Sequence, residues 1–135
     1  MALVTWSDGL SVGVKAIDDQ HTTLFNCIND LHDAMMKGQA RSIIGSLLCK
    51  LLSYTRSHFS EEEDLMANYK YPGLSQHLIQ HRALTKQVEE YIARFEKGDL
   101  ALSNDLADFL SGWLYNHILG VDKVYGPYMN ERGVR

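Results

Sequence analysis

Two pairs of metal-competent side chains lie in the stretch from His58 to His81, which reads HFSEEEDLMANYKYPGLSQHLIQH. In each pair, His58 with Glu62 and His77 with His81, the members are four residues apart. On a helix this spacing places both side chains on one face, one turn above the other. Between the pairs Pro72 breaks the helical pattern, because the residue before a proline avoids the helical region. The stretch therefore predicts two antiparallel helices with half of a metal site at their joined ends.

Apolar residues recur every three or four positions along four segments of the chain, which is typical of amphipathic helices. The expected helices cover about residues 18–37, 41–67, 74–96 and 103–125, after an extended arm over residues 1–17. Because short turns join them, we expect an all-α, up-down-up-down four-helix bundle with an extended N-terminal arm. A less regular all-helical packing is the alternative. We expect the 135 residues to form one domain, 1–135.

Local signals predict where the helices begin and end. Asp18 is expected to cap the start of the first helix, and Gly38 is expected to end it. Pro127 is expected to stop the fourth helix, in which Val124 is expected to face inward. Trp6 is expected to anchor the arm.

The composition excludes several classes of protein. A formal net charge of −4 and a pI near 5.8 argue against a surface that binds nucleic acid or an anionic membrane. No segment reaches the ~18 uninterrupted apolar residues that insertion into a membrane requires, and the N-terminus has no secretory signal. The two cysteines, Cys27 and Cys49, are expected to be buried and reduced, which favours a cytoplasmic protein.

Seven candidate metal ligands are distributed over the four expected helices: His21, His58, Glu62, His77, His81, His117 and Asp122. In an antiparallel hairpin, residues at equal height are equidistant from the turn. Averaging the residue numbers of the candidates on neighbouring helices gives 39.5 for the first and second helices, 69.5 for the second and third, and 99.25 for the third and fourth. Each midpoint falls in an expected turn, so we predict that all seven lie at one level of the bundle.

A bundle core does not bury so many polar groups at one level without a common partner. A single inward histidine is usually a satisfied core residue, but each unpartnered polar group costs about 1 to 3 kcal/mol. His32 also faces inward, but it lies roughly 16 Å along the axis from His21 and is excluded from the site. Asp122 lies about 140° around a regular helix from His117, so we predict a π-type turn near Leu119-Gly120 that brings them together.

The donor set restricts the metal. Imidazole and carboxylate donors suit iron, manganese or zinc. If two octahedral ions share two bridging carboxylates and a bridging oxygen, the five imidazoles leave one coordination position vacant, which a small molecule could take. A ferritin-like site requires paired Glu-x-x-His motifs, and the sequence has none.

The series His21, His58-x-x-x-Glu62, His77-x-x-x-His81, His117-x-x-x-x-Asp122 resembles the ligand set of hemerythrins. The opening arm, HFSEEEDLM and WLYNHILGVDKVYGP resemble the bacterial single-domain branch, the bacteriohemerythrins. The resemblance covers nearly the whole chain. It implies reversible oxygen binding at a non-haem di-iron centre, in which two iron ions share an oxo or hydroxo bridge.

The resemblance also implies a role for each ligand. One iron is fully coordinated, by His77, His81 and His117; the other keeps the vacancy and is held by His21 and His58; Glu62 and Asp122 bridge the two. The expected apolar pocket for oxygen consists of Trp113, Leu114, Ile118, Leu24, Ile28 and Phe59. For Leu24, Ile28 and Phe59 ordinary core packing is an equally good interpretation. The acidic residues Glu61, Glu63 and Asp64 are expected to form a solvated face.

Several functions remain open from the sequence. The leading hypothesis is oxygen storage or delivery to an oxygen-consuming enzyme, without enzymatic activity. A second is a sensing module for oxygen, redox state or nitric oxide. A third is a weak di-iron peroxidase or a nitric-oxide-consuming enzyme, although no spare acid–base pair or substrate cleft is evident. A fourth is the handling of iron or zinc.

Overall fold

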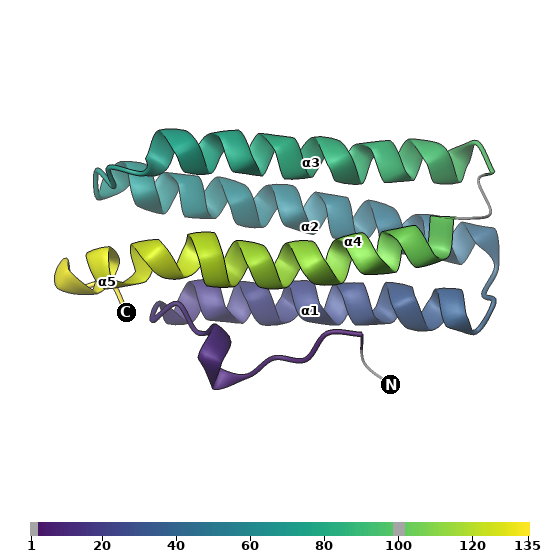
Figure 1. The fold of residues 1–135 in the computed structure, drawn as a ribbon, viewed down its shortest axis with the longest axis horizontal. Coiled ribbons are helices and arrows are strands. Elements are labelled where there is room, and N and C mark those ends of the chain that lie inside the picture. Colours follow the sequence, from purple (N-terminus) through teal and green to yellow (C-terminus); the bar gives the residue numbers. More distant parts are fainter. Residues whose placement is uncertain (1–2, 99–101) are drawn as a thin grey trace.

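Four long helices lie side by side, each antiparallel to the next along the chain (Figure 1). The computed structural model describes residues 3–98 and 102–135. The long helices are α1 (Lys15–Met36), α2 (Arg41–Asn68), α3 (Leu74–Glu96) and α4 (Leu102–His117). A π-helix, η2 (Ile118–Asp122), and a short helix, α5 (Lys123–Glu131), continue α4, and a 3-10 turn, η1 (Asp8–Leu10), interrupts the arm. No strand occurs in these ranges, and the predicted all-α four-helix bundle is confirmed.

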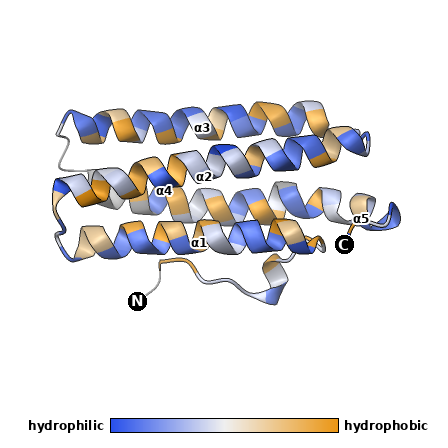
Figure 2. Ribbon diagram, turned by 180° about the vertical axis from the view of Figure 1, so that it is seen from behind, coloured by the Kyte–Doolittle hydropathy of each residue, from blue (hydrophilic) through white to orange (hydrophobic). Residues whose placement is uncertain are grey.

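Each long helix carries hydrophobic and hydrophilic residues on different sides, as Figure 2 shows. The apolar sides meet in one core cluster. Its fully buried members from α1, α2 and α4 include Leu24, Ile28, Leu31, Leu48, Leu51, Met66, Leu110 and Leu114, and partly buried residues of α3 pack against them. Burial of these faces, rather than local propensity, stabilises the bundle.

The N-terminal arm runs along the outside of α1 (Figure 1). The side-chain amide of Asn29 pairs with the backbone of Val4, donating to its carbonyl at 2.9 Å and accepting from its N–H at 3.0 Å. Trp6 packs edge-on against Phe25, with ring centroids 5.8 Å apart. The prediction that Trp6 anchors the arm is confirmed.

The first helix begins earlier than predicted. It starts at Lys15, with Val14 as the residue before it, so the expected capping role of Asp18 is wrong. The Asp18 carboxylate instead accepts hydrogen bonds from the Ser11 hydroxyl at 2.5 Å and the Val12 N–H at 2.9 Å. This aspartate holds the arm against the helix that it was expected to start.

Gly38 ends α1 as predicted. It follows the last helical turn with a φ of 63°, in the left-handed region that favours glycine. The next expected turn, Gly98-Asp99, lies partly outside the described residues.

The predicted end of the fourth helix is wrong. Pro127 lies inside α5, which continues to Glu131 although the proline removes one backbone donor. Tertiary contacts outweigh that loss: Met129 is fully buried, and Asn130 donates to the Gly13 carbonyl at 2.9 Å. Val124 was expected to face inward and is 61% exposed. The π-helix adds one residue to the turn, so Tyr125 takes the buried position instead.

Two further expectations from composition are tested. Both cysteines are free thiols, but only Cys27 is buried; Cys49 is exposed, because it lies on the solvent side of α2. In the described ranges, none of the helices combines the length and the apolar character that crossing a membrane demands.

Candidate metal centre

The π-helix η2 covers Ile118–Asp122, the position at which a widened turn was predicted. That prediction is confirmed. A π-helix has more residues per turn than an α-helix, so Asp122 faces the same side as His117 despite a spacing of five. The His117 Nε2 lies 3.1 Å from Asp122 Oδ1. The widened turn therefore delivers a carboxylate to the level of the imidazoles.

The structure brings all seven candidate ligands together. Their donor atoms form two groups, each with members within 4.8 Å of one another: His77, His81, His117 and Asp122 in one, and His21, His58, Glu62 and Asp122 in the other. Asp122 belongs to both groups. Glu62 also approaches the first group, with Oε2 3.7 Å from His77 Nε2. All four long segments of the bundle contribute, at one level as the sequence predicts.

Most of these donor atoms lack a hydrogen-bond partner within the described chain. The unpartnered atoms are Nε2 of His21, His58, His81 and His117, both oxygens of Glu62, and Oδ2 of Asp122. The side chains are at most 5% exposed, so water does not compensate. Lone pairs that converge without partners in a buried space fit a bound cation, whose bonds would satisfy them together.

The charges within the cluster interact strongly. Burial alone would raise the pKa of Glu62, as would the Asp122 charge, but His58 and His21 outweigh both and lower it to about 2. Burial likewise opposes ionisation of Asp122, yet its contacts with His117, His21 and His77 hold its pKa well below the usual value. Both carboxylates are therefore anionic at neutral pH, as metal ligands must be.

The imidazoles differ from one another. Burial lowers the pKa of His21, but the neighbouring Asp122 and Glu62 carboxylates outweigh it and raise that pKa to about 9. For His81 burial dominates and lowers the pKa to about 3. In the metal-free chain at neutral pH, His21 is protonated and His81 is neutral.

Hydrogen bonds on the outer sides of two imidazoles were missed by the sequence analysis. Nδ1 of His81 lies 2.8 Å from Glu63 Oε2, and Nδ1 of His58 lies 2.6 Å from Gln20 Oε1. The amide nitrogen of Gln20 donates to Glu61. The expected solvated face holds for Glu61 and Asp64, which are exposed, but Glu63 is half-buried against His81. The equal-height test could have found Glu63, since the midpoint of 63 and 81 is 72, in the turn.

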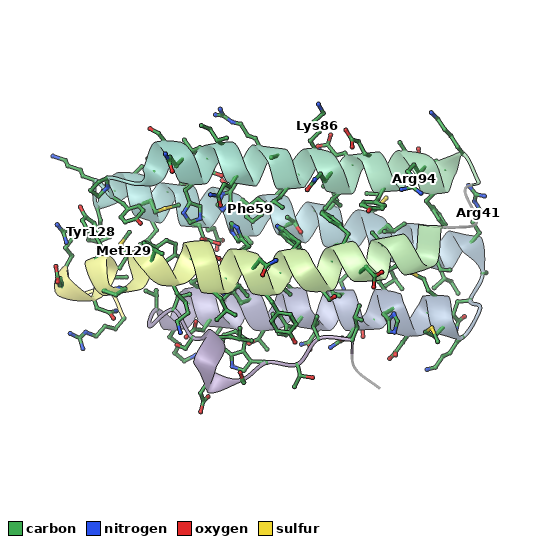
Figure 3. The ribbon with its side chains drawn as sticks, in the orientation of Figure 1. Arg41, Phe59, Lys86, Arg94, Tyr128 and Met129 are labelled. Carbon is green, nitrogen blue, oxygen red and sulfur yellow. The ribbon has the colours of Figure 1, made fainter. Side chains whose placement is uncertain are left out.

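Aromatic residues pack directly on the ligands. Phe59 stacks on His81, with centroids 3.8 Å apart and an interplanar angle of 5°. Trp113 lies nearly parallel to His117, with centroids 6.2 Å apart. Figure 3 shows Phe59 between the helices, in the half of the bundle nearer to Tyr128.

The other expected pocket residues are buried as well. Leu24, Ile28, Leu114 and Ile118 are at most 1% exposed and belong to the same core cluster. His32 is half-buried beside Leu31 and Met35 and belongs to neither donor group. Tyr125 is fully buried and stacks on His77, with centroids 5.7 Å apart.

Comparison with known proteins identifies the family. Residues 12–129 match the family described as Hemerythrin HHE cation binding domain. The chain belongs to the hemerythrin family. The predicted resemblance is confirmed, and the structure places the seven candidate ligands within two groups that could hold a cation. Family and cluster together support the binding of non-haem iron.

Relatives from this hemerythrin family match most of the chain. Bacteriohemerythrin from Stenotrophomonas maltophilia is 40% identical over 125 residues, 93% of this chain and 80% of the relative. Bacteriohemerythrin from Methylococcus capsulatus is 38% identical over 133 residues, 96% of this chain and 99% of the relative. A crystal structure of wild-type hemerythrin superposes with a TM-score of 0.87 at 37% identity, covering 93% of this chain and 97% of that one.

Proposed function

We propose that this protein binds molecular oxygen reversibly at a non-haem di-iron centre and stores it or delivers it to an oxygen-consuming enzyme. The observation that carries the proposal is the pair of donor groups that share Asp122. Two groups that share a carboxylate suit two ions a few ångströms apart. A single ion would leave several of the buried donors without a partner.

The ligands divide as the two groups do. His77, His81 and His117 would hold one iron, and His21 and His58 the other, so the second has fewer protein donors. Asp122 would bridge the two, and so would Glu62, whose oxygens lie 3.7 Å from His21 Nε2 and from His77 Nε2. When bound, the iron pair supplies the electrons and the vacant position that reversible oxygen binding requires.

The apolar wall supports binding rather than turnover. In this proposal Trp113, Leu114 and Ile118 exclude water from the vacant position, with Leu24, Ile28 and Phe59 behind them; all six are buried. A dry, apolar surrounding favours a neutral diatomic molecule and slows the escape of reduced oxygen, which would leave oxidised iron.

We also propose a cytoplasmic location, because two free cysteines suit a reducing compartment.

The decisive experiment measures metal content together with the optical spectrum of the reduced protein before and after exposure to air. We expect two irons per chain and an oxygen-dependent band that disappears when oxygen is removed. Rapid irreversible oxidation would favour a sensor or a weak peroxidase. Zinc alone, after expression in iron-replete medium, would refute the iron chemistry.

A further inference from the structure

Glu63 directly follows the candidate ligand Glu62 in α2, and its carboxylate reaches across to α3. Glu63 Oε2 lies 2.8 Å from Nδ1 of His81. The glutamate is 31% exposed, whereas His81 is only 2% exposed. The contact therefore joins a partly solvated charge to a buried imidazole in the donor group.

This contact determines which nitrogen of His81 carries the proton. An ionised carboxylate only accepts hydrogen bonds, so Nδ1 must donate. In a neutral imidazole the lone pair then lies on Nε2, which has no partner among the described atoms and belongs to the cluster with His77 and His117. Phe59 stacks flat on the His81 ring and limits its rotation. Charge and stacking together direct the lone pair into the site.

His58, in the other donor group, has a different partner. Its Nδ1 lies 2.6 Å from the side-chain carbonyl of Gln20. The Gln20 amide nitrogen donates to Glu61, which fixes the amide so that its oxygen faces His58. A neutral amide orients an imidazole, but it adds far less electron density than a carboxylate does. The acidic residues on either side of Glu62 thus support one ligand in each group, by different means.

We propose that Glu63 is a positioning residue that strengthens His81 as a metal donor through its charge, and that Gln20, aimed by Glu61, orients His58 without that charge. The two ions are then held by imidazoles of unequal basicity. The ion at His77, His81 and His117 is the more strongly bound, and its oxidised state is the more stabilised. This inference rests on the proposed function, because it concerns metal at the same cluster.

The test uses three variants of the full chain. Glu63→Ala removes the acceptor, and Glu63→Gln keeps an acceptor but removes the charge. The matched control is Glu89→Gln, because Glu89 lines the same surface groove between α2 and α3 and pairs with Arg56. Three properties are measured: the ¹⁵N shifts of the His81 ring before metal is added, the zinc dissociation constants in competition with a chelator, and the midpoint potential of the iron-loaded chain.

In Glu63→Ala we expect the proton of the neutral His81 ring to be no longer held on Nδ1. We expect this variant to bind one of two zinc ions about 10- to 100-fold more weakly. Glu63→Gln should keep the preference, weaken zinc less and raise the midpoint potential, while Glu89→Gln should match the wild type. Wild-type ring shifts and zinc affinity in Glu63→Ala would overturn the proposal, as would equal effects in Glu89→Gln. The ring shifts and zinc affinities do not depend on iron. A chain that binds no oxygen would refute the proposed function and leave this test intact.

Discussion

The Nε2 atom of His21 lies 2.9 Å from Oδ2 of Asp122, although His21 belongs to the first long helix and Asp122 follows the last one. The contact exists because η2 turns Asp122 toward the core that α1 lines. It also makes the protonation of His21 depend on a residue that belongs to both donor groups. Proton binding and stability are therefore linked at this pair.

The first prediction concerns the stability of the metal-free chain at alkaline pH. Although burial opposes it, the carboxylates raise the pKa of His21 from 6.5 to about 9 in the folded state. The folded chain thus holds this proton more tightly than the unfolded chain does. The resulting stabilisation is complete below the unfolded pKa of 6.5 and is lost as the pH rises through about 9. Its size is of order a few kcal/mol.

Urea unfolding of the metal-free chain across this pH range measures the effect. His117, whose pKa is also raised, contributes in the same direction. The metal-loaded chain is the control, because metal displaces these protons and removes the alkaline decline. A metal-free stability that stays constant from pH 6.5 to 9 would contradict the coupling.

The second prediction removes the shared carboxylate charge. Asp122→Asn should weaken metal binding at both groups by more than about tenfold, because the remaining amide is a poor bridging ligand. Metal content after dialysis against a chelator measures the loss. Asp19→Asn is the matched control, since Asp19 is exposed and pairs with Lys15. If only one ion were lost, Asp122 would not be shared between the groups.

The third prediction concerns the close approach of the arm to α5. A Cβ atom on Gly126 would lie 2.0 Å from the Val12 carbonyl oxygen, which is backbone and cannot move aside alone. Gly126→Ala should therefore lower the free energy of unfolding by roughly 1 to 3 kcal/mol or more, and release the arm. Gly112→Ala, whose Cβ meets nothing within 4 Å, should instead stabilise α4 by about 0.5 to 1 kcal/mol.

Thermal unfolding followed by tryptophan fluorescence in a Trp113→Phe background separates these outcomes, because Trp6 then reports the position of the arm against Phe25. An unchanged melting temperature in Gly126→Ala would show that the arm is not held at this point.

The fourth prediction concerns the apolar wall. Leu114→Ala should enlarge the pocket, admit water and accelerate autoxidation of the reduced, iron-loaded chain. Leu48→Ala removes the same volume from the core about 15 Å along α2 from His58, so it should destabilise the fold similarly without that acceleration. The rate of loss of the reduced spectrum in air measures the difference. Equal rates in the two variants would remove the special role assigned to Leu114.

The sequence was sufficient for the bundle and for the height of the donor cluster because both depend on regular spacing. The helices and the four-residue ligand pairs both follow the 3.6-residue period of an α-helix. Asp122 could be predicted as a ligand because its five-residue spacing from His117 requires a widened turn, and the structure has one there. The widened turn also shifts the inward face of the residues after it by one position. A regular helix therefore predicts Val124 in the core, whereas Tyr125 is the buried residue.

The remaining errors arise where a side chain bonds to another element. Asp18 has the residue type of a helix cap, but it binds the arm at Val12. Pro127 has the residue type of a helix stop, but neighbouring contacts keep α5 helical. Glu63 has the residue type of a solvated acid, but it lies opposite His81. Residue type alone does not specify such partners.

The five-residue interval between His117 and Asp122 has a consequence for genome surveys. A pattern search that allows only three- or four-residue intervals on helices would pair His58 with Glu62 and His77 with His81, leave out Asp122, and describe a centre with one carboxylate. Such a centre would be classified with mononuclear proteins. Search profiles for paired metals in helical bundles should therefore accept one extra residue wherever a helix can widen.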